Sequence, residues 1–173
     1  MAGTEPRKVD VKRRRREIVR CLEDFPRQYI ALEHAMAAFG TDFDLRKFKS
    51  ACEATDMDEY NRVQAVERAL GRVQNYASDL AIAGVRLARI APRSQADGSA
   101  ARQAFVALRD AKVIEAELCR RLTRGHEART MIEHSYVDTT AGYIHKSARL
   151  IHDTARDFIG RYRTWIEPFL DQT

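Results

Sequence analysis

The sequence predicts an all-α protein, an antiparallel helical bundle of three long helices with shorter helices inserted between them. Apolar residues recur at alternating spacings of three and four along three long stretches, which is the period of a helix. No stretch of useful length alternates apolar and polar residues, as a half-buried strand would. Glycine and proline, which interrupt helices, number only eight and four among 173 residues.

The first long pattern places seven apolar residues on one helical face between Ile18 and Phe39, and Gly40 is a natural end for this helix. Pro26 lies inside the pattern, so we expect a kink there or a division into two collinear helices. A short helix over Leu45–Ala54, with Phe48 as its apolar anchor, is expected to follow.

The second long pattern runs from Val63 to Leu87, and Pro92 closes it. Gly84 falls on its apolar stripe although glycine costs roughly 1 kcal/mol in a helix relative to alanine, which indicates close approach of another helix. The polar residues 93–99 predict a loop. Two shorter helices are then expected, over Ala100–Asp110 and Val113–Arg124.

The last long pattern runs from Ile144 to Trp165, and Pro168 is expected to end it. Asp138, Thr139 or Thr140 could cap its N-terminus. Before it, Gly125–Asp138 is the least regular part of the chain.

Length and composition fit one globular domain, because 45% of the residues are hydrophobic and 32% are charged. No signal-like segment opens the sequence and no uncharged stretch approaches the ~20 residues of a membrane span, so we expect neither a secreted nor a membrane protein. The three cysteines, Cys21, Cys52 and Cys119, form no C-x-x-C pair. We interpret them as free thiols that pack as small apolar side chains in a cytoplasmic protein.

The excess positive charge lies at the N-terminus. Residues 1–16 hold seven bases and two acids, whereas residues 17–173 hold 23 of each. We therefore divide the chain into a basic N-terminal tail (1–16) and a single helical domain (17–173). The tail either contacts an anionic partner such as nucleic acid or is only solvated, and the neutral body argues against a broad surface that coats nucleic acid.

Three residue types that suit phosphate chemistry lie close together before the last helix: Arg129, His134 and Tyr136. On a continuous helix the five steps from Arg129 to His134 turn by about 140°, so their convergence requires a helix end or a bend between them.

This pattern, R-x-x-x-x-H-x-Y ahead of a last long helix, resembles the signature of the HEPN superfamily, and most closely the HepT-like toxins of bacterial toxin–antitoxin pairs. Residues 60–70 (YNRVQAVERAL) also resemble the second helix of that family, and residues 104–114 (AFVALRDAKVI) resemble the segment before its motif. The resemblance covers roughly Glu17–Phe169 and implies a HEPN-like helical fold.

The resemblance implies a metal-independent endoribonuclease that needs no cofactor and whose active cleft forms across a homodimer. Arg129 would bind the scissile phosphate, as a permanently ionised guanidinium can. His134 would transfer protons to or from the ribose 2′-OH or the leaving oxygen, and the 2′-OH would be the nucleophile. Tyr136 would be the residue to which a minimal nucleotidyltransferase antitoxin attaches AMP, which would block RNA by bulk and by negative charge.

Other interpretations of these residues remain open. Family members often carry Asn, Asp or His after the motif arginine, where this chain has Thr130, which is polar and can still form hydrogen bonds. Arg129 could instead pair with Glu133 on the surface of a helix, and His134 could be an interhelical histidine. The second function considered is therefore a non-catalytic HEPN module that docks a nucleotidyltransferase or binds nucleotide. His145 and His152 are two turns apart, too far to share a small ion.

Overall fold

The computed structural model describes residues 5–93, 98–134 and 140–171, and within these ranges it contains helices and no strand. There are six helices in the described ranges. Three are long and three are short: α1 (Glu5–Ala37), α2 (Leu45–Glu53), α3 (Met57–Ala88), α4 (Ala100–Asp110), α5 (Ala116–His134) and α6 (Ala141–Leu170). The all-α class and the pattern of long and short helices are therefore confirmed.

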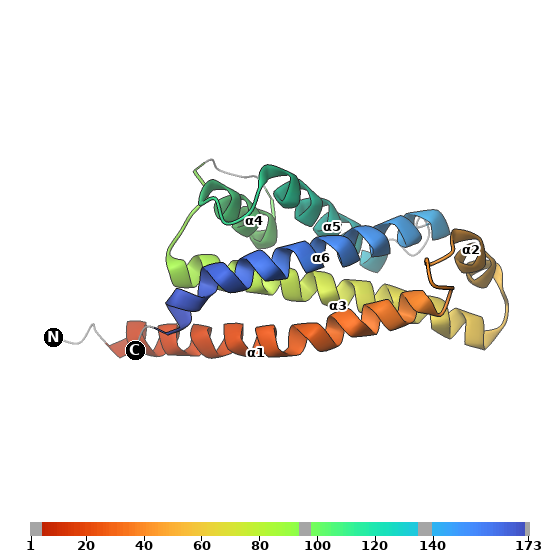
Figure 1. Ribbon diagram of the computed structural model, residues 1–173, viewed down its shortest axis with the longest axis horizontal. Helices are drawn as coiled ribbons and strands as arrows, with labels where there is room; N and C mark the ends of the chain where they lie inside the picture. The colour runs from red at the N-terminus through yellow and green to blue at the C-terminus, as the bar shows by residue number, and fades with distance from the viewer. Residues whose placement is uncertain (1–4, 94–97, 135–139, 172–173) are drawn as a thin grey trace.

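The long helix α3 is the centre of the bundle, because it contacts each of the other five helices. Figure 1 shows α1 and α6 lying along α3, with α4 and α5 packed on the side away from α1 and with α2 at one end. The direction of α3 is shared by α6, whereas α1 runs opposite to both. The first turns of α1 and the last turns of α6 lie at the same end of the molecule.

The apolar faces expected from the sequence form one continuous core. Its largest fully buried side chains come from every one of the helices and from the turn after α1: Ile18, Leu32, Phe39, Phe48, Leu70, Leu80, Phe105, Leu108, Leu122, Ile151, Phe158 and Tyr162. Phe48 anchors α2 as expected. Thr140 caps α6, because its hydroxyl accepts a hydrogen bond from the backbone N–H of Tyr143 at 3.3 Å.

The close approach predicted at Gly84 is confirmed. A Cβ atom at this position would lie 2.5 Å from the hydroxyl oxygen of Tyr162 and 2.9 Å from the ring of Trp165, both on α6. Tyr162 is fully buried, and its hydroxyl donates a hydrogen bond to the carbonyl of Leu80 at 2.6 Å. Gly84 therefore lets α6 approach α3 closely enough for this bond.

Helix α5 is longer than the sequence pattern predicts. Residues 125–134 were expected to be irregular, but they continue the helix without a break. Gly125, which weakens the local helix signal, is buried against α3, and a Cβ there would lie 2.5 Å from Oε1 of Gln74. Packing against α3 therefore outweighs the low helix propensity of this glycine.

Two expectations about proline are also corrected. Helix α1 contains Pro26 and is not divided, although its direction changes in its second half (Figure 1). Helix α6 does not end before Pro168 but continues to Leu170. Pro168 has no N–H to donate to the carbonyl four residues earlier, and the helix ends two residues beyond it.

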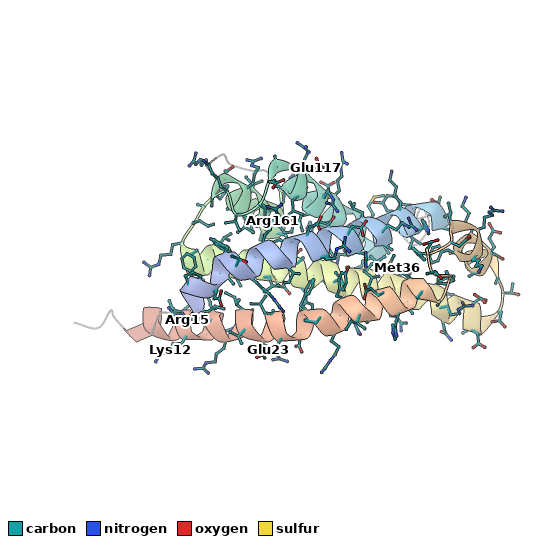
Figure 2. The ribbon with its side chains drawn as sticks, viewed as in Figure 1. Lys12, Arg15, Glu23, Met36, Glu117 and Arg161 are labelled. Carbon is teal, nitrogen blue, oxygen red and sulfur yellow. The ribbon has the colours of Figure 1, made fainter. Side chains whose placement is uncertain are left out.

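Most of the basic N-terminal run is helical, since α1 begins at Glu5. Arg14 forms an ion pair with Asp10 at 2.6 Å. Figure 2 shows Arg15 on the side of α1 that faces α6, whereas Lys12 and Glu23 lie on the opposite side. Part of the run therefore faces the end of α6, and part of it projects away from the bundle.

All three cysteines are free, but they differ in exposure. Cys119 is buried, Cys21 is half-buried and Cys52 is exposed. Burial is the main cause of the raised pKa of the Cys21 and Cys119 thiols. The expectation of apolar packing is confirmed for Cys119 and is wrong for Cys52.

Candidate functional site

The motif residues Arg129 and His134 lie on one uninterrupted helix, α5, and not on either side of a bend. Since each residue of a helix turns by 100°, their side chains leave the axis about 140° apart. Arg129 lies on the side of α5 that packs on the bundle, with 24% of its side chain exposed, whereas His134 is an exposed residue at the C-terminal end. Within the chain these two groups do not converge, and the expectation of a bend between them is wrong.

Arg129 forms an ion pair with Glu133, one turn further along α5, at 2.7 Å between Nη2 and Oε2. Its Nε–H group is buried and finds no acceptor among the described residues. Its charge also acts on neighbouring groups. Burial raises the pKa of Asp79 on α3 and Arg129 opposes that rise, while burial and then Arg129 lower the pKa of His126. The positive charge of Arg129 therefore favours the ionised form of Asp79 across the contact between α5 and α3.

Thr130 uses its hydroxyl locally, donating a hydrogen bond to the carbonyl of His126 one turn earlier at 2.9 Å. The ring of His126 in turn contacts the hydroxyl of Ser99 at 2.9 Å, so this histidine helps to join the start of α4 to α5. Tyr136, the expected acceptor of AMP, lies outside the described residues.

A hollow of about 380 Å³ lies beside Glu133, between α3 and the end of α5. Its lining is mostly polar and includes two exposed arginines one turn apart on α3, Arg68 and Arg72. Gly71 lies between them, and a Cβ atom at this position would lie 3.5 Å from Oε1 of Glu133. The hollow therefore holds two guanidinium groups, of Arg68 and Arg72, and two carboxyl groups, of Glu67 and Glu133. No sequence pattern singles out these two arginines, because an arginine pair at i, i+4 is also typical of a solvated helix face.

Glu67, which lines the same hollow, has a raised pKa because burial disfavours its charged form, although Gln64 donates a hydrogen bond to it at 2.8 Å. A carboxyl whose pKa is raised in the folded state binds more protons than it does in the unfolded chain. Its contribution to stability is therefore present at low pH and is lost as the pH rises through the folded pKa.

We expect Glu67→Gln to remove the loss of stability that ionisation of Glu67 causes as the pH rises. An amide keeps the contact with Gln64 and carries no charge to desolvate. The free energy of unfolding in urea, measured at several pH values between 4 and 7, should fall less steeply with rising pH in the variant than in the parent protein. Identical slopes for the two proteins would contradict this interpretation of Glu67.

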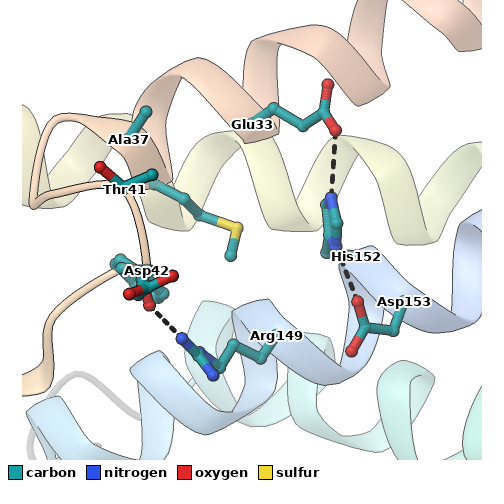
Figure 3. Close-up of a pocket in the computed structure, with 9 residues that line it drawn as sticks. Glu33, Ala37, Thr41, Asp42, Arg149, His152 and Asp153 are labelled. Carbon is teal, nitrogen blue, oxygen red and sulfur yellow. Dashed lines mark hydrogen bonds and ion pairs between the residues drawn. The ribbon is translucent and has the colours of Figure 1, made fainter.

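The remaining histidines do not form a metal site. Among the described residues, no group of three or more potential ligands is placed to hold an ion. His34 is exposed, and His145 stacks on Phe43 while its Nε2 contacts the carbonyl of that residue at 2.6 Å. His152 lines a second hollow, which lies between α1 and α6 (Figure 3). The sequence did not indicate that charged residues of both helices meet there.

In comparisons with known proteins, no family model, no curated protein and no solved structure matches the chain. In the part of the chain that the structure describes, no helix has the length and apolar character needed to cross a membrane.

Proposed function

We propose that this chain is a HEPN-type, HepT-like endoribonuclease toxin that cleaves RNA by attack of the ribose 2′-OH. The observation that carries the proposal is the position of the motif: His134 is exposed at the end of α5, directly after Glu133, which pairs with Arg129 and lines the same hollow as Arg68 and Arg72. Together these groups supply a proton-transfer residue and several cations for a phosphodiester.

The chemistry needs two protomers. The side chains of Arg129 and His134 point about 140° apart on a straight helix, so one copy does not offer both to the same phosphate. In a homodimer that pairs the ends of two α5 helices, Arg129 of one copy binds the scissile phosphate while the second copy provides His134. The 2′-OH loses its proton as its oxygen attacks phosphorus, the bond to the 5′-oxygen breaks, and that oxygen gains a proton, with His134 taking part in this proton transfer. A 2′,3′-cyclic phosphate end and a 5′-hydroxyl end remain.

The partner in this proposal is a minimal nucleotidyltransferase antitoxin that attaches AMP to Tyr136. An AMP group two residues from His134 adds bulk and negative charge, which repel the RNA backbone. Mass spectrometry after co-expression with such a transferase tests this step. An adduct mapped to Tyr136 is expected, and an adduct at any other residue would contradict it.

The ion pair between Arg129 and Glu133, at 2.7 Å, favours the second candidate function. A guanidinium already paired on its own helix is typical of a structural residue, as in a non-catalytic HEPN module that docks a nucleotidyltransferase or binds nucleotide. In the ribonuclease proposal, the phosphate displaces Glu133 from Arg129.

Incubation of the purified full chain with single-stranded RNA in EDTA distinguishes the two functions. The ribonuclease is expected to leave 2′,3′-cyclic phosphate and 5′-hydroxyl ends, and to leave the matching 2′-deoxy oligonucleotide intact, because that substrate lacks the nucleophile. RNA that stays intact would remove the ribonuclease proposal and favour the non-catalytic module.

A further inference from the structure

The outward face of α1 carries a row of cations near the start of the helix, which we call the cationic row. Its members are all exposed: Lys12, Arg13, Arg16 and Arg20. Since each residue of a helix turns by 100°, these four side chains leave the axis within an arc of about 100°, and they span about 12 Å along it. No acidic side chain falls in this arc between Lys12 and Arg20. Figure 2 shows Lys12 on the side of α1 that faces away from α6.

The two acidic residues nearest to the row do not neutralise it. Asp10 forms an ion pair at 2.6 Å with Arg14, which is not a member of the row. Glu17 lies near α3, since burial and then the charge of Glu17 raise the pKa of Asp79 on that helix. The cationic row therefore keeps its positive charge toward solvent.

The members of the row have almost no partners of their own. Lys12, Arg13 and Arg16 form no ion pair with any residue that the structure describes. Arg20 only approaches Asp24, at 4.0 Å, and 85% of its side chain is exposed. Like charges four residues apart disfavour a helix, and the row contains two such pairs. An anionic partner bound along the row would remove this repulsion.

We propose that the cationic row binds the phosphodiester backbone of a nucleic acid strand. Phosphates follow one another along a strand at short, regular intervals, so cations about one turn apart on a helix meet them in succession. Three of the four members are arginines, whose planar guanidinium donates two hydrogen bonds to one phosphate. Contacts of this kind do not read the bases, so the binding is independent of sequence and weakens steeply with salt.

A membrane surface is the other large polyanion that a basic helix can meet. Helices that lie on a membrane bury an apolar face at the lipid boundary. The apolar face of α1 is already used in the core, where Ile18, Phe25 and Leu32 are at most 3% exposed. The exposed large apolar residues of α1, Val19 and Ile30, are three turns apart and form no patch. These observations favour nucleic acid over lipid.

The row lies away from the motif on α5, and the inference does not rest on RNA cleavage. Figure 1 shows the start of α1 at one end of the bundle, whereas α2 and the beginning of α6 lie at the other. A strand bound along the row contacts phosphates only, whether or not the strand is later cut.

The experiment measures binding of two fluorescent single strands, 2′-O-methyl RNA and DNA, by anisotropy between about 50 and 200 mM salt. Neither strand has a free 2′-OH, so neither can be cleaved by attack of that group during the measurement. The purified full chain is compared with a triple variant of the row, Lys12→Gln, Arg13→Gln and Arg16→Gln. Glutamine is a good helix former, and circular dichroism checks that the variant folds.

The matched control removes the same charge from exposed residues of α2, at the other end of the bundle: Arg46→Gln, Lys47→Gln and Lys49→Gln. We expect the row variant to bind at least about 10-fold more weakly than the parent protein. Its slope of log affinity against log salt should be smaller by about 2, because each lost contact with a single strand contributes about 0.7. The α2 variant should bind within about 3-fold of the parent, because charges far from the strand are screened.

Three results would overturn the proposal: no binding of either strand by the parent, equal losses of affinity in the two variants, or dependence on the row only in binding to vesicles of phosphatidylserine and phosphatidylcholine. The strand that binds more tightly identifies the RNA or DNA source of the backbone. A chain that binds strands through the row but cleaves no RNA contradicts only the ribonuclease proposal. A chain that cleaves RNA but binds strands equally well without the row contradicts only this inference.

Discussion

Replacing His134 with alanine is expected to slow RNA cleavage in EDTA by about 10²–10⁴-fold, which is what a positioned proton-transfer group typically contributes. The fold should be unaffected, since His134 is an exposed residue at the last position of α5 and its removal opens no cavity in the core. Initial rates on a fluorescent single-stranded RNA, with thermal unfolding followed by circular dichroism, measure the two effects separately.

His34→Ala is the matched control for this prediction, because His34 is also exposed and lies near the end of a helix, α1. It should cleave RNA at the rate of the parent protein. Equal rates for His134→Ala and His34→Ala, with both proteins folded, would exclude His134 as the proton-transfer residue.

Gly84→Ala is expected to lower the free energy of unfolding by about 1 kcal/mol, because overpacking a core costs about 2 kcal/mol and the helix regains roughly 1 kcal/mol. The new methyl group would lie 2.5 Å from the hydroxyl oxygen of Tyr162 and 2.9 Å from the ring of Trp165. Tyr162 is fully buried and cannot move away without weakening its hydrogen bond to Leu80. That cost exceeds the roughly 1 kcal/mol that a helix gains when alanine replaces glycine. Urea unfolding followed by circular dichroism gives the value.

Gly160→Ala makes the same chemical change on α6, where a Cβ atom meets nothing within 4 Å. Here only the gain in helix propensity remains, so the variant should be more stable than the parent by up to about 1 kcal/mol. A Gly84→Ala protein that is as stable as the Gly160→Ala protein would contradict the close packing of α3 and α6.

The sequence was most informative where apolar residues recur with the period of a helix. The faces around Ile18, Leu70 and Phe158 were predicted and are buried, and the bounds of α4 were predicted to the residue. The significance of Gly84 could also be predicted, because a glycine on an apolar stripe has a helix-propensity cost that only a packing reason offsets.

Prediction failed where tertiary contacts override local signals. Gly125 weakens the helix pattern, yet α5 continues through it and packs against α3. A glycine is needed there because Gln74 of α3 occupies the space that a side chain would need. Because α5 continues to His134, it has no bend that would bring Arg129 and His134 together, and the two side chains point in different directions.

The charged hollows were also beyond prediction, because they combine residues far apart in sequence. Glu33 and His152 are 119 positions apart, and each taken alone is an ordinary residue of an amphipathic helix. The ion pair of Arg129 with Glu133 could be anticipated from their spacing of four, but the hollow that Arg68 and Arg72 form beside it could not.

The central claim, that two protomers share one RNA-cleaving cleft, is tested most directly by mixing two inactive variants. Arg129→Ala and His134→Ala are purified separately, assayed alone, then unfolded together, refolded and assayed on RNA in EDTA. Each variant alone should cleave at least about 10²-fold more slowly than the parent protein. The mixture should recover cleavage, because each mixed dimer holds one intact Arg129 and one intact His134 on different chains. A mixture that forms mixed dimers and cleaves no faster than the separate variants would contradict the shared cleft.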